Sequence, residues 1–372
     1  MSQSRTIVVG GGIIGTTAAA LLAEGGTDVT LIEQTAVAAG ASGRNSGTIQ
    51  HPFDPVLLEL HRETLDRYRE LAALDAGFAF PDQPAGVLLL TDDLAAAGER
   101  AGELMSAYPE LRAEVLDAAA VGALEPSLAA GWAAIRVATG YPVVPEAATR
   151  MMAARAVRAG AAVRIGMEAR PWLEDGRVRG VALGDGETIP GSRVLVAAGP
   201  WTPEVLDLEP AWPPISRTFG VTVQVSLPDG PRSILEEGVV HTINTPSGHA
   251  DSLFSLVTAD GVATVGSTFF ADQPDPGALA PILLERGSVF VPGLAHAEIR
   301  EVRLCARPQS VDGRPFIGPV PGADGLFVCA GHGPWGMSTG PASAAMAVDL
   351  MTGREDRIPA ALRADRAWAG AQ

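Results

Sequence analysis

Apolar runs of the kind found in buried strands open the chain. Residues 7–9 read Ile-Val-Val and residues 29–32 read Val-Thr-Leu-Ile, and neither run alternates with polar residues. Such continuous apolar runs are typical of strands that are covered on both faces. Between them, residues 16–23 are alanine- and leucine-rich and predict a helix. Strand, glycine-rich turn, helix and second strand in this order predict the first unit of a doubly wound parallel sheet.

The rest of the chain alternates between helical and strand patterns. Apolar residues at helical spacing predict helices over 54–76 and 145–158, and an alanine-rich helical region follows a strand at 86–90 and extends to about residue 130. Residues 162–165 are expected to pair with 178–183 through a turn at Asp175-Gly176. Residues 194–200 repeat the form of the first strand, a buried run that stops at glycine.

The later half predicts a second type of sheet. Residues 215–304 contain strand-like runs separated by turns rich in proline and glycine, which favours an antiparallel sheet in its own layer. A strand, a loop, a second strand, a glycine-rich turn and a helix from about Pro341 to Met351 follow. The fold class expected is therefore α/β: a Rossmann-like nucleotide-binding domain with a second α+β substrate domain on a mostly antiparallel sheet. The expected boundaries are 1–80, 145–214 and 305–372 for the first domain and 81–144 and 215–304 for the second.

Composition narrows the functional classes. The 372 residues carry a formal net charge of −16, which argues against nucleic acid or an anionic membrane surface as a partner. No apolar run approaches the length of a membrane span, and the first strand begins too early for a cleaved signal peptide, so a cytoplasmic protein is expected. Two cysteines, Cys305 and Cys329, give no disulfide framework, and no cluster has metal-ligand spacing. The chain contains no lysine, so every fixed side-chain cation is an arginine.

The first glycine-rich turn has the spacing of a dinucleotide-binding fingerprint. Gly10 can form the tight turn, Gly12 has no side chain to block a pyrophosphate, and Gly15 lets the helix approach the sheet. The helix N-terminus presents free N–H groups to the phosphates. Glu33, at the end of the second strand, is placed to accept hydrogen bonds from an adenosine ribose. The alternative is an ordinary glycine-rich turn, but the whole unit occurs in the right order.

Three further segments point to a flavin. Residues 40–47 are small or hydroxyl-bearing and include Arg44, which could neutralise pyrophosphate charge. Residues 197–201 (Ala-Ala-Gly-Pro-Trp) follow a buried strand. Residues 325–338 lead into the last helix, whose first amides, from Gly336, Met337 and Ser338, could stabilise negative charge on a reduced isoalloxazine ring. The alternatives are a flexible surface loop for residues 40–47 and, for residues 325–338, a tight strand-to-helix turn without a ligand.

Together these segments resemble the D-amino acid oxidase family of flavoproteins, in particular its glycine oxidase, sarcosine oxidase and D-amino acid dehydrogenase branches. The resemblance covers nearly the whole chain and is specific at the N-terminal fingerprint, at residues 197–199, and at residues 307–318 with the Gly331-His332 turn. It implies FAD and oxidation of a carbon–nitrogen bond by hydride transfer to flavin N5, giving an imine that hydrolyses to a carbonyl compound. The residues expected to bind FAD are Gly10, Gly12, Ile13, Ile14, Gly15, Glu33, Gln34, Ala41, Ser42, Arg44, Asn45, Ser46, Gly47, Ala169, Ala198, Gly199, Trp201, Cys305, Gly331, Gly333, Trp335, Gly336, Met337 and Ser338.

The resemblance also implies roles near the reacting atoms. Arg307 matches the carboxylate-binding arginine of the glycine oxidase branch, and its planar fork suits a carboxylate. The competing interpretation pairs Arg307 with Asp312. His332 and Trp335 are expected to line the substrate pocket, although His332 equally fits a structural role, and His51 is a weaker candidate. Cys305 matches a cysteine that sarcosine oxidases bond to the flavin, but a covalent link is not favoured here.

Two departures from the family affect the substrate and the electron acceptor. Near residues 254–257 relatives often carry a tyrosine that touches substrate, whereas this chain has Phe254. Sarcosine oxidases use a lysine to promote reaction with oxygen, and this chain contains none. The identity of the electron acceptor, oxygen or another oxidant, therefore remains open. Two alternatives to amine oxidation also remain: a flavin-dependent 2-hydroxy-acid dehydrogenase, and a non-catalytic dinucleotide-binding module or flavin subunit of a complex. The expected partners are a small amine or amino acid and an electron acceptor, and a homo-oligomer is possible.

Overall fold

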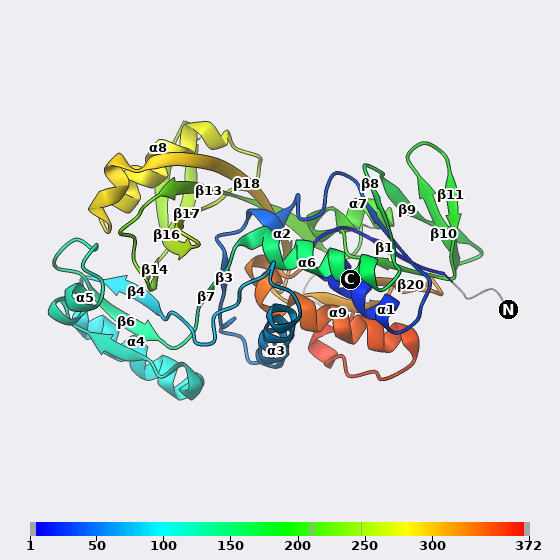
Figure 1. The fold of residues 1–372 in the computed structure, drawn as a ribbon, viewed down its shortest axis with the longest axis horizontal. Helices are drawn as coiled ribbons and strands as arrows, with labels where there is room; N and C mark the ends of the chain where they lie inside the picture. The colour runs from blue at the N-terminus through cyan, green and yellow to red at the C-terminus, as the bar shows by residue number, and fades with distance from the viewer. Residues whose placement is uncertain (1–4, 209–210, 247, 368–372) are drawn as a thin grey trace.

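Two large sheets make up the core of the protein in the computed structural model, which describes residues 5–208, 211–246 and 248–367. In Figure 1 one sheet, covered by helices α1 and α9, occupies the right half and the other occupies the left half. Strand β18 (Glu298–Ser310) runs from the left half into the centre of the molecule. The site described below lies where this strand reaches the segments of the first sheet.

The first sheet is six-stranded and parallel around its centre, as a doubly wound sheet requires. Its order is β19-β20-β12-β1-β2-β8, and the outermost pair, β19 and β20, is antiparallel. Strand β1 is central because its four residues are all buried and can be covered on both faces. The strands are β1 (Thr6–Val9), β2 (Val29–Glu33), β8 (Ala162–Ile165), β12 (Arg193–Val196), β19 (Phe316–Pro319) and β20 (Leu326–Ala330).

The predicted partner of residues 162–165 is wrong. Strand β8 pairs in parallel with β2, and the hairpin through Asp175 and Gly176 instead joins β9 (Ala169–Glu174) to β10 (Arg177–Leu183). The turn itself was placed correctly, since both residues have positive φ angles, 50° and 72°. An additional strand, β9, lies between β8 and the turn and is therefore the nearer partner. Strands β9, β10 and β11 (Thr188–Pro190) form a separate three-stranded sheet at the far right of Figure 1.

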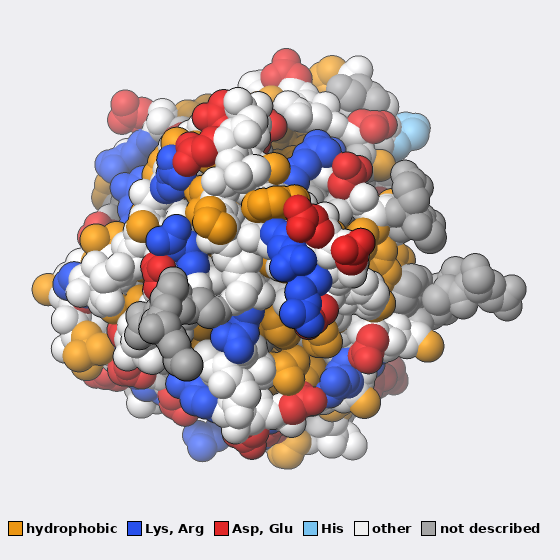
Figure 2. Space-filling model, turned by 90° about the vertical axis from the view of Figure 1, so that its right-hand side faces the viewer, with side chains coloured by type: hydrophobic (Ala, Val, Ile, Leu, Met, Phe, Trp, Pro, Cys, Tyr) orange, Lys and Arg blue, Asp and Glu red, His pale blue; other side chains and the backbone are white. Residues whose placement is uncertain are grey.

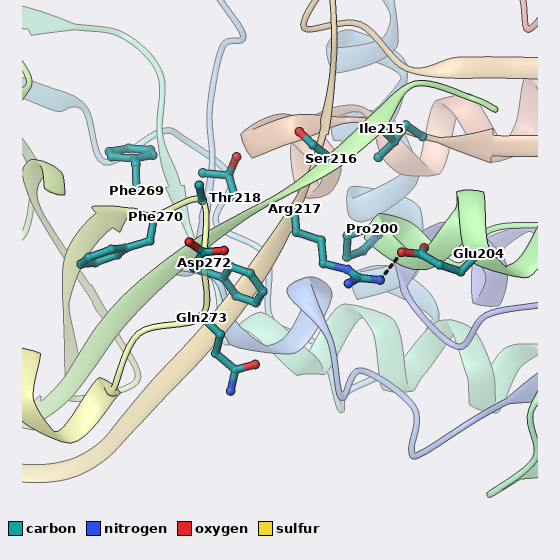
Figure 3. Close-up of a pocket in the computed structure, with 12 residues that line it drawn as sticks. Pro200, Glu204, Ile215, Ser216, Arg217, Thr218, Phe269, Phe270, Asp272 and Gln273 are labelled. Atoms are coloured by element: carbon teal, nitrogen blue, oxygen red, sulfur yellow. Dashed lines mark hydrogen bonds and ion pairs between the residues drawn. The ribbon is translucent and has the colours of Figure 1, made fainter. Parts of the chain in front are cut away.

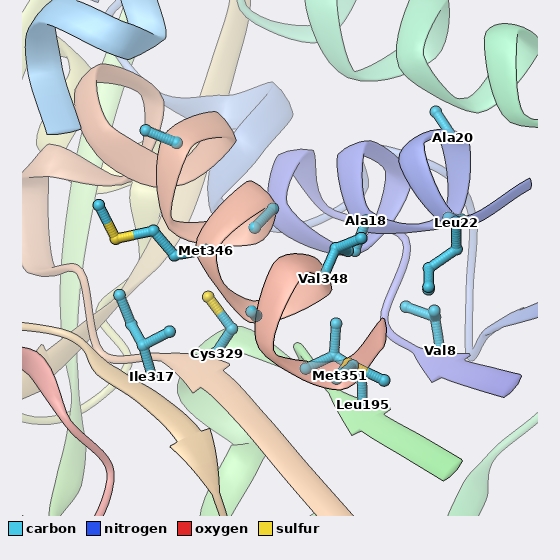
Figure 4. Close-up of a cluster of buried hydrophobic side chains, with 14 of the residues drawn as sticks. Val8, Ala18, Ala20, Leu22, Leu195, Ile317, Cys329, Met346, Val348 and Met351 are labelled. Carbon is cyan, nitrogen blue, oxygen red and sulfur yellow. The ribbon is translucent and has the colours of Figure 1, made fainter. Parts of the chain in front are cut away.

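Helices α1 (Ile13–Glu24) and α9 (Gly336–Thr352) pack side by side on the first sheet. Figure 4 shows their side chains, among them Leu22 and Val348, meeting Val8 and Leu195 from the strands below. The alanines of both helices keep the contact close. Helices α3 (Leu58–Leu74) and α6 (Pro145–Arg158) extend this layer and confirm the helices expected over 54–76 and 145–158.

Helix α9 begins at Gly336, five residues before the predicted start at Pro341. Proline usually marks a helix start because it lacks an N–H group. Here the carbonyl of Met337, which Pro341 cannot serve, accepts a hydrogen bond of 2.9 Å from the hydroxyl group of Tyr68. A tertiary contact thus allows the helix to extend past the proline.

The second sheet is mostly antiparallel and confirms the fold class. Its order is β18-β13-β17-β16-β14-β4-β6-β5, with β15 paired to β16, and among the described strands of this second sheet only β14 and β4 pair in parallel. Helix α8 (Pro276–Ser288) covers one face of it. The other strands are β4 (Val87–Thr91), β5 (Glu114–Leu116), β6 (Ala133–Val137), β13 (Ile215–Ser226), β14 (Ile234–Glu237), β15 (His241–Thr245), β16 (Gly248–Ala259) and β17 (Val262–Phe269).

The remaining elements are short or peripheral. The alanine-rich region after β4 forms two helices with β5 between them, and a two-stranded pairing of β3 with β7 links the halves of the molecule. The domain boundaries stay a prediction, and the one at residue 304 falls inside β18. These elements are α2 (Ala41–Arg44), β3 (Thr48–Ile49), α4 (Leu94–Ala107), α5 (Ala118–Leu124), β7 (Tyr141–Pro142), α7 (Thr202–Leu206) and the 3₁₀ turns η1 (Pro109–Leu111), η2 (Gly199–Trp201), η3 (Pro292–His296), η4 (Gly333–Trp335) and η5 (Ala360–Leu362).

The surface carries both signs of charge. Figure 2 shows arginine and acidic side chains intermixed on one face of the molecule, with no broad basic area there. Ion pairs such as Arg177–Asp324, at 2.7 Å, connect exposed groups. Within the described residues, no helix combines the length and the apolar character that crossing a bilayer requires.

The approach of α1 to β1 gives a stability prediction. A Cβ atom on Gly15 would lie 1.9 Å from the carbonyl oxygen of Gly10, a backbone atom that cannot move aside cheaply. We expect Gly15→Ala to lower the free energy of unfolding by about 1–3 kcal/mol or more, measured by denaturant unfolding. Gly98→Ala is the matched control, because Gly98 is exposed in α4 with no atom near its Cβ position, and it should be neutral or stabilising. Equal loss in both variants, or none in either, would contradict the prediction.

Candidate active site

The glycine-rich turn after β1 has the geometry that a dinucleotide requires. Gly10 has a φ angle of +116°, and a Cβ atom there would lie 2.4 Å from the carbonyl oxygen of Ala197. A Cβ atom on Gly12 would meet the hydroxyl oxygen of Ser42 at 3.1 Å. The chain therefore passes close to β12 and to the 40–47 loop, and helix α1 begins immediately afterwards at Ile13.

The end of β2 lies beside the same turn. The Glu33 carboxylate accepts hydrogen bonds from the backbone N–H groups of Gly11, at 2.6 Å, and Thr35, at 2.9 Å. The side chain of Gln34 donates to Glu168 at 2.8 Å, which brings the start of β9, and with it Ala169, next to this strand end. The predicted adenosine-binding residues are thus close together, while their contacts with FAD stay a prediction.

The 40–47 loop contacts the N-terminus of α1 and is stabilised by hydrogen bonds between its own residues. The Ser42 hydroxyl accepts a hydrogen bond of 3.0 Å from the backbone N–H group of Ile13. The Asn45 side chain donates to the carbonyl oxygens of Ala41 and Ser42, both at 3.0 Å, and accepts from Gly47 at 2.9 Å. Ser46 lies half-buried between Asn45 and Gly47.

Arg303 on β18 is the buried cation that binds this loop, and it was not among the residues predicted from the sequence. Its guanidinium group donates to the carbonyl oxygens of Asn45, at 2.9 Å, and Gly43, at 3.4 Å, and burial lowers its pKa. Arg44, the predicted counter-charge, is exposed, and its guanidinium group lies 3.5 Å from the carbonyl oxygen of Leu304. Period-two alternation along β18 could have indicated Arg303, because it shares a face with Arg307.

The segment after β12 reaches the other side of this loop. Ala198 leads into η2, where Gly199 has a φ angle of +58°. The Trp201 ring lies 3.5 Å from the Cβ position of Gly40 and is partly exposed. The guanidinium carbon of Arg217 lies 5.9 Å from its ring centroid.

The glycine-rich bend at residues 331–338 leads into a helix that packs beside the helix after the first glycine-rich turn. Gly336, Met337 and Ser338 form the first turn of α9, as predicted for amides that face a ring oxygen. A Cβ atom on Gly340 would lie 3.0 Å from the Ile14 side chain and 3.4 Å from that of Ile13. The N-termini of α1 and α9 therefore lie side by side, which places two positive dipole ends together.

His332 is buried and lacks a partner for its ring. Both ring nitrogens are inaccessible to solvent and have no hydrogen-bond partner in the described protein. Burial lowers the pKa of His332 to about 3, so the imidazole is neutral at physiological pH. Buried polar atoms are normally satisfied, so a bound group that supplies a partner fits this position. Gly331 and Gly333, both with positive φ angles, flank it, and half-buried Trp335 follows.

His51 lies one residue beyond the segment that contacts α9. Its Nδ1 atom accepts a hydrogen bond of 3.0 Å from the Phe53 N–H group, and its Nε2 atom lies 3.6 Å from Glu110. Burial lowers its pKa, opposed by Glu110. The neighbouring His61, whose Nδ1 atom is 3.3 Å from the Ser338 carbonyl oxygen, has its pKa lowered to about 4, also by burial. The His61 side chain thus contacts the first turn of α9, and a catalytic role for His51 stays a prediction.

Arg307 projects from β18 over the neighbouring strand. Its guanidinium group occupies the space above Gly220, where a Cβ atom would lie 2.4 Å from Nη1, and it donates to the Thr268 carbonyl oxygen at 3.0 Å. The Phe269 ring lies 4.7 Å from the guanidinium carbon. The alternative pairing with Asp312 is wrong, because Asp312 accepts two hydrogen bonds of 2.9 Å from Arg366 instead.

Two other expectations concern residues on the second sheet. Cys305 is buried on β18, two residues before Arg307, and burial raises the pKa of its thiol. Phe254 does not stand in for a substrate-touching tyrosine, because it is 1% exposed and stacks on Phe290 at a centroid distance of 4.5 Å under helix α8. Its face of β16 points to the core rather than to the site.

A cleft of about 680 Å³ opens beside this region. It is lined by residues of η2, α7 and β13, by Phe269 at the end of β17, and by the segment that follows. Figure 3 shows Arg217 paired with Glu204 across it, at 2.5 Å. Phe269 thus borders both the cleft and the guanidinium group of Arg307.

The fold and the site together define a dinucleotide-binding protein. A close glycine turn, an acidic strand end and two helix N-termini converge, and the orphaned nitrogens of His332 lie in the adjoining bend. No group of three or more histidine, cysteine or acidic side chains in the described part of the chain is arranged to hold a metal ion.

Comparison with known proteins agrees with this class. The family model described as "FAD dependent oxidoreductase" matches residues 5–350, so the chain belongs to this family and uses FAD. It is 31% identical to a glycine oxidase of Pseudomonas aeruginosa over 96% of this chain and 97% of that protein. Structures of a glycine oxidase from Bacillus cereus and an iminodiacetate oxidase from Chelativorans resemble it with TM-scores of 0.84 and 0.83, at 23% and 24% identity. Each covers 98% of this chain, and the alignments span 99% and 100% of those two chains.

The buried Cys305 gives a prediction about FAD attachment. Because burial holds Cys305 as a neutral thiol, we expect it to form no bond to the flavin. Acid precipitation of the yellow protein should leave all flavin absorbance in the supernatant. Yellow colour in the pellet of the wild-type protein but not of Cys305→Ala would show a covalent link instead.

Proposed function

We propose that the protein oxidises an amino acid or a related amine whose carboxylate binds Arg307. The observation that carries this proposal is the position of Arg307, on the strand that also holds the 40–47 loop through Arg303. The names of the relatives support it, since the glycine oxidases and the iminodiacetate oxidase are named for substrates that combine amine and carboxylate groups. The arginine fork binds a carboxylate through two parallel hydrogen bonds.

In the proposed reaction the cofactor and the protein have different roles. FAD, when bound, would supply the redox chemistry by acting as the hydride acceptor at N5, so that the substrate carbon that bears nitrogen could be oxidised to an imine, which would hydrolyse to a carbonyl compound. The protein contributes position and electrostatics. Arg307 fixes the carboxylate, and the first-turn amides of α9 stabilise negative charge that develops nearby. Neutral His332 could donate or accept one hydrogen bond without adding charge.

The electron acceptor is oxygen or another oxidant. The chain has no lysine to promote reaction with oxygen, but Arg303 and Arg307 supply buried or half-buried positive charge close to the predicted flavin position. Anaerobic mixing with panels of amino acids and hydroxy acids, followed by readmission of air, would identify the substrate class and the acceptor together. Bleaching by hydroxy acids alone would support the 2-hydroxy-acid dehydrogenase instead.

The arginine clamp can be tested directly. Arg307→Met keeps the apolar stem but removes the charged fork, so kcat/KM for a carboxylate-bearing amine should fall about 100-fold, mainly through KM. Arg300→Met is the matched control, because Arg300 lies on the same strand but is exposed and bonds to Ser226. Steady-state kinetics measures both. An unchanged KM in Arg307→Met would refute the clamp.

A further inference from the structure

The face of the second sheet that is turned away from α8 carries a row of polar and small residues. Glu236 on β14 pairs with Ser255 on β16, and Ser255 pairs with Gly266 on β17. A Cβ atom on Gly266 would contact both Ser255 and Thr222, at 3.2 Å each. Thr222 in turn pairs with Arg303 on β18. The row therefore leads from Glu236 to the arginine that holds the 40–47 loop.

Neighbouring residues on these strands point the other way. Leu235, Leu256 and Val265 belong to the apolar cluster under α8, so the row itself faces the FAD-binding segments. The next carboxylate along β14, Glu237, also points away from the row, since it accepts from the Phe254 N–H group at 2.7 Å and pairs with Arg286. Glu236 is thus the acidic side chain that β14 contributes to the site face.

The carboxylate of Glu236 has one hydrogen-bond partner and no ion pair among the described residues. The side-chain amide of Gln50 donates to its Oε1 atom at 3.2 Å. Gln50 follows β3, and its backbone N–H group donates to Ser338 at the start of α9, at 3.0 Å. Glu236 is therefore connected through a single residue to the helix N-terminus that is expected to face the flavin.

Two buried acceptors on this face of the sheet lack a donor. The side-chain amide nitrogen of Gln50 faces Glu236. The amide oxygen of Gln50 can only accept hydrogen bonds, and it is buried without a partner. The buried hydroxyl oxygen of Thr222, further along the row, also has no partner. A carboxylate beside an unused amide oxygen fits a positively charged group with several N–H donors, which is what an ammonium group offers.

Arg307 lies on the same face at a distance that suits a small substrate. Its guanidinium group reaches the Thr268 carbonyl on β17, and β17 is separated from β14 by β16. Two strand spacings correspond to about 10 Å across the sheet. Hydrogen bonds of about 3 Å at each end would leave room for a molecule of amino-acid size between the cationic and the anionic side chain.

We propose that Glu236, assisted by Gln50, binds the ammonium group of the substrate and accepts a proton from it. This inference rests on the proposed function and adds the residue that recognises the amine. In the step, one N–H bond of the ammonium group breaks, its proton moves to a Glu236 carboxylate oxygen, and the electron pair stays on nitrogen. The resulting neutral amine carries the lone pair that oxidation of the neighbouring carbon requires. A hydroxy acid has no such cation, so Glu236 favours amines over hydroxy acids.

The ionisation of Glu236 supports this role. Burial raises the pKa of Glu236 to about 7, and the hydrogen bond from Gln50 opposes the rise. The residues that face it from neighbouring elements are uncharged Leu89 on β4 and Ser255 on β16, while Arg303 and Arg307 on β18 lie further along the same face. His51 follows Gln50 but has its pKa lowered, so it is neutral at pH 7. Substrate binding therefore needs Glu236 ionised, and kcat/KM should fall as the pH drops below about 7.

Glu236→Gln in the FAD-loaded protein tests the proposal. Glutamine keeps an acceptor for Gln50 but loses the charge, so kcat/KM for the best amine substrate should fall about 100-fold, and the acidic limb near pH 7 should disappear. Affinity for propionate, a carboxylate without nitrogen, should stay the same or increase, as read from the change in flavin absorbance. Glu301→Gln, at an exposed position of β18, is the control and should change none of these.

The possible results distinguish a failure of the proposed function from a failure of the proposed role of Glu236. If no amine bleaches the wild-type flavin, the proposed function fails. If amines bleach the wild type and Glu236→Gln keeps both its kcat/KM and its acidic limb, the proposed function stands and the role of Glu236 is overturned. Loss of propionate binding in Glu236→Gln would also overturn it, because it would show a structural role. Should that variant fail to hold FAD, Glu236→Asp must retain the acidic limb with a reduced kcat/KM, and loss of the limb there would overturn the inference.

Discussion

The hydrogen bonds from Arg303 to the carbonyl oxygens of Gly43 and Asn45 tie the two sheets of this protein together. A buried guanidinium group is costly unless its donors are satisfied, so this contact fixes β18 against the 40–47 loop. Arg307 lies four residues further along the strand and Glu236 lies at the other end of the row that includes Arg303. This contact helps to position Arg307 relative to the dinucleotide-binding turn, and Glu236 is connected to the start of α9 through Gln50 as well.

The electrostatics of the site differ from those of the whole chain. The molecule carries a net charge of −16, but the segments that converge on the site contribute two arginines and the N-termini of α1 and α9. Such a local field suits the pyrophosphate of FAD and a substrate carboxylate, both of which the overall charge would repel. Anions are therefore attracted locally at the site, while the net negative charge of the whole molecule repels them.

Sequence patterns predicted the parts of this site that depend on local chemistry. The fingerprint at Gly10, Gly12 and Gly15 follows from backbone geometry, and helix α6 was predicted with its observed limits because proline starts it. The predicted partner of β8 and the predicted start of α9 were wrong, since each depends on a part of the chain that is distant in sequence, β2 and Tyr68 respectively. Glu236 and Gln50 were missed for the same reason, because only the register of β14 and the fold of the β3 segment bring them together.

Some of the buried polar atoms without a hydrogen-bond partner lie near the proposed site, whereas others, such as the hydroxyl oxygens of Thr17 in α1 and Thr149 in α6, lie elsewhere in the fold. Both nitrogens of His332, the amide oxygen of Gln50 and the hydroxyl oxygen of Thr222 are buried without partners. All three residues lie on the segments that surround the expected flavin and substrate positions, where a folded chain alone leaves hydrogen-bonding capacity unused. Leaving such atoms unpaired costs stability, and natural sequences accept that cost mainly at functional sites. Ligands that supply the missing partners would bind the folded state selectively, so the same atoms that weaken the empty protein would couple its stability to FAD and substrate.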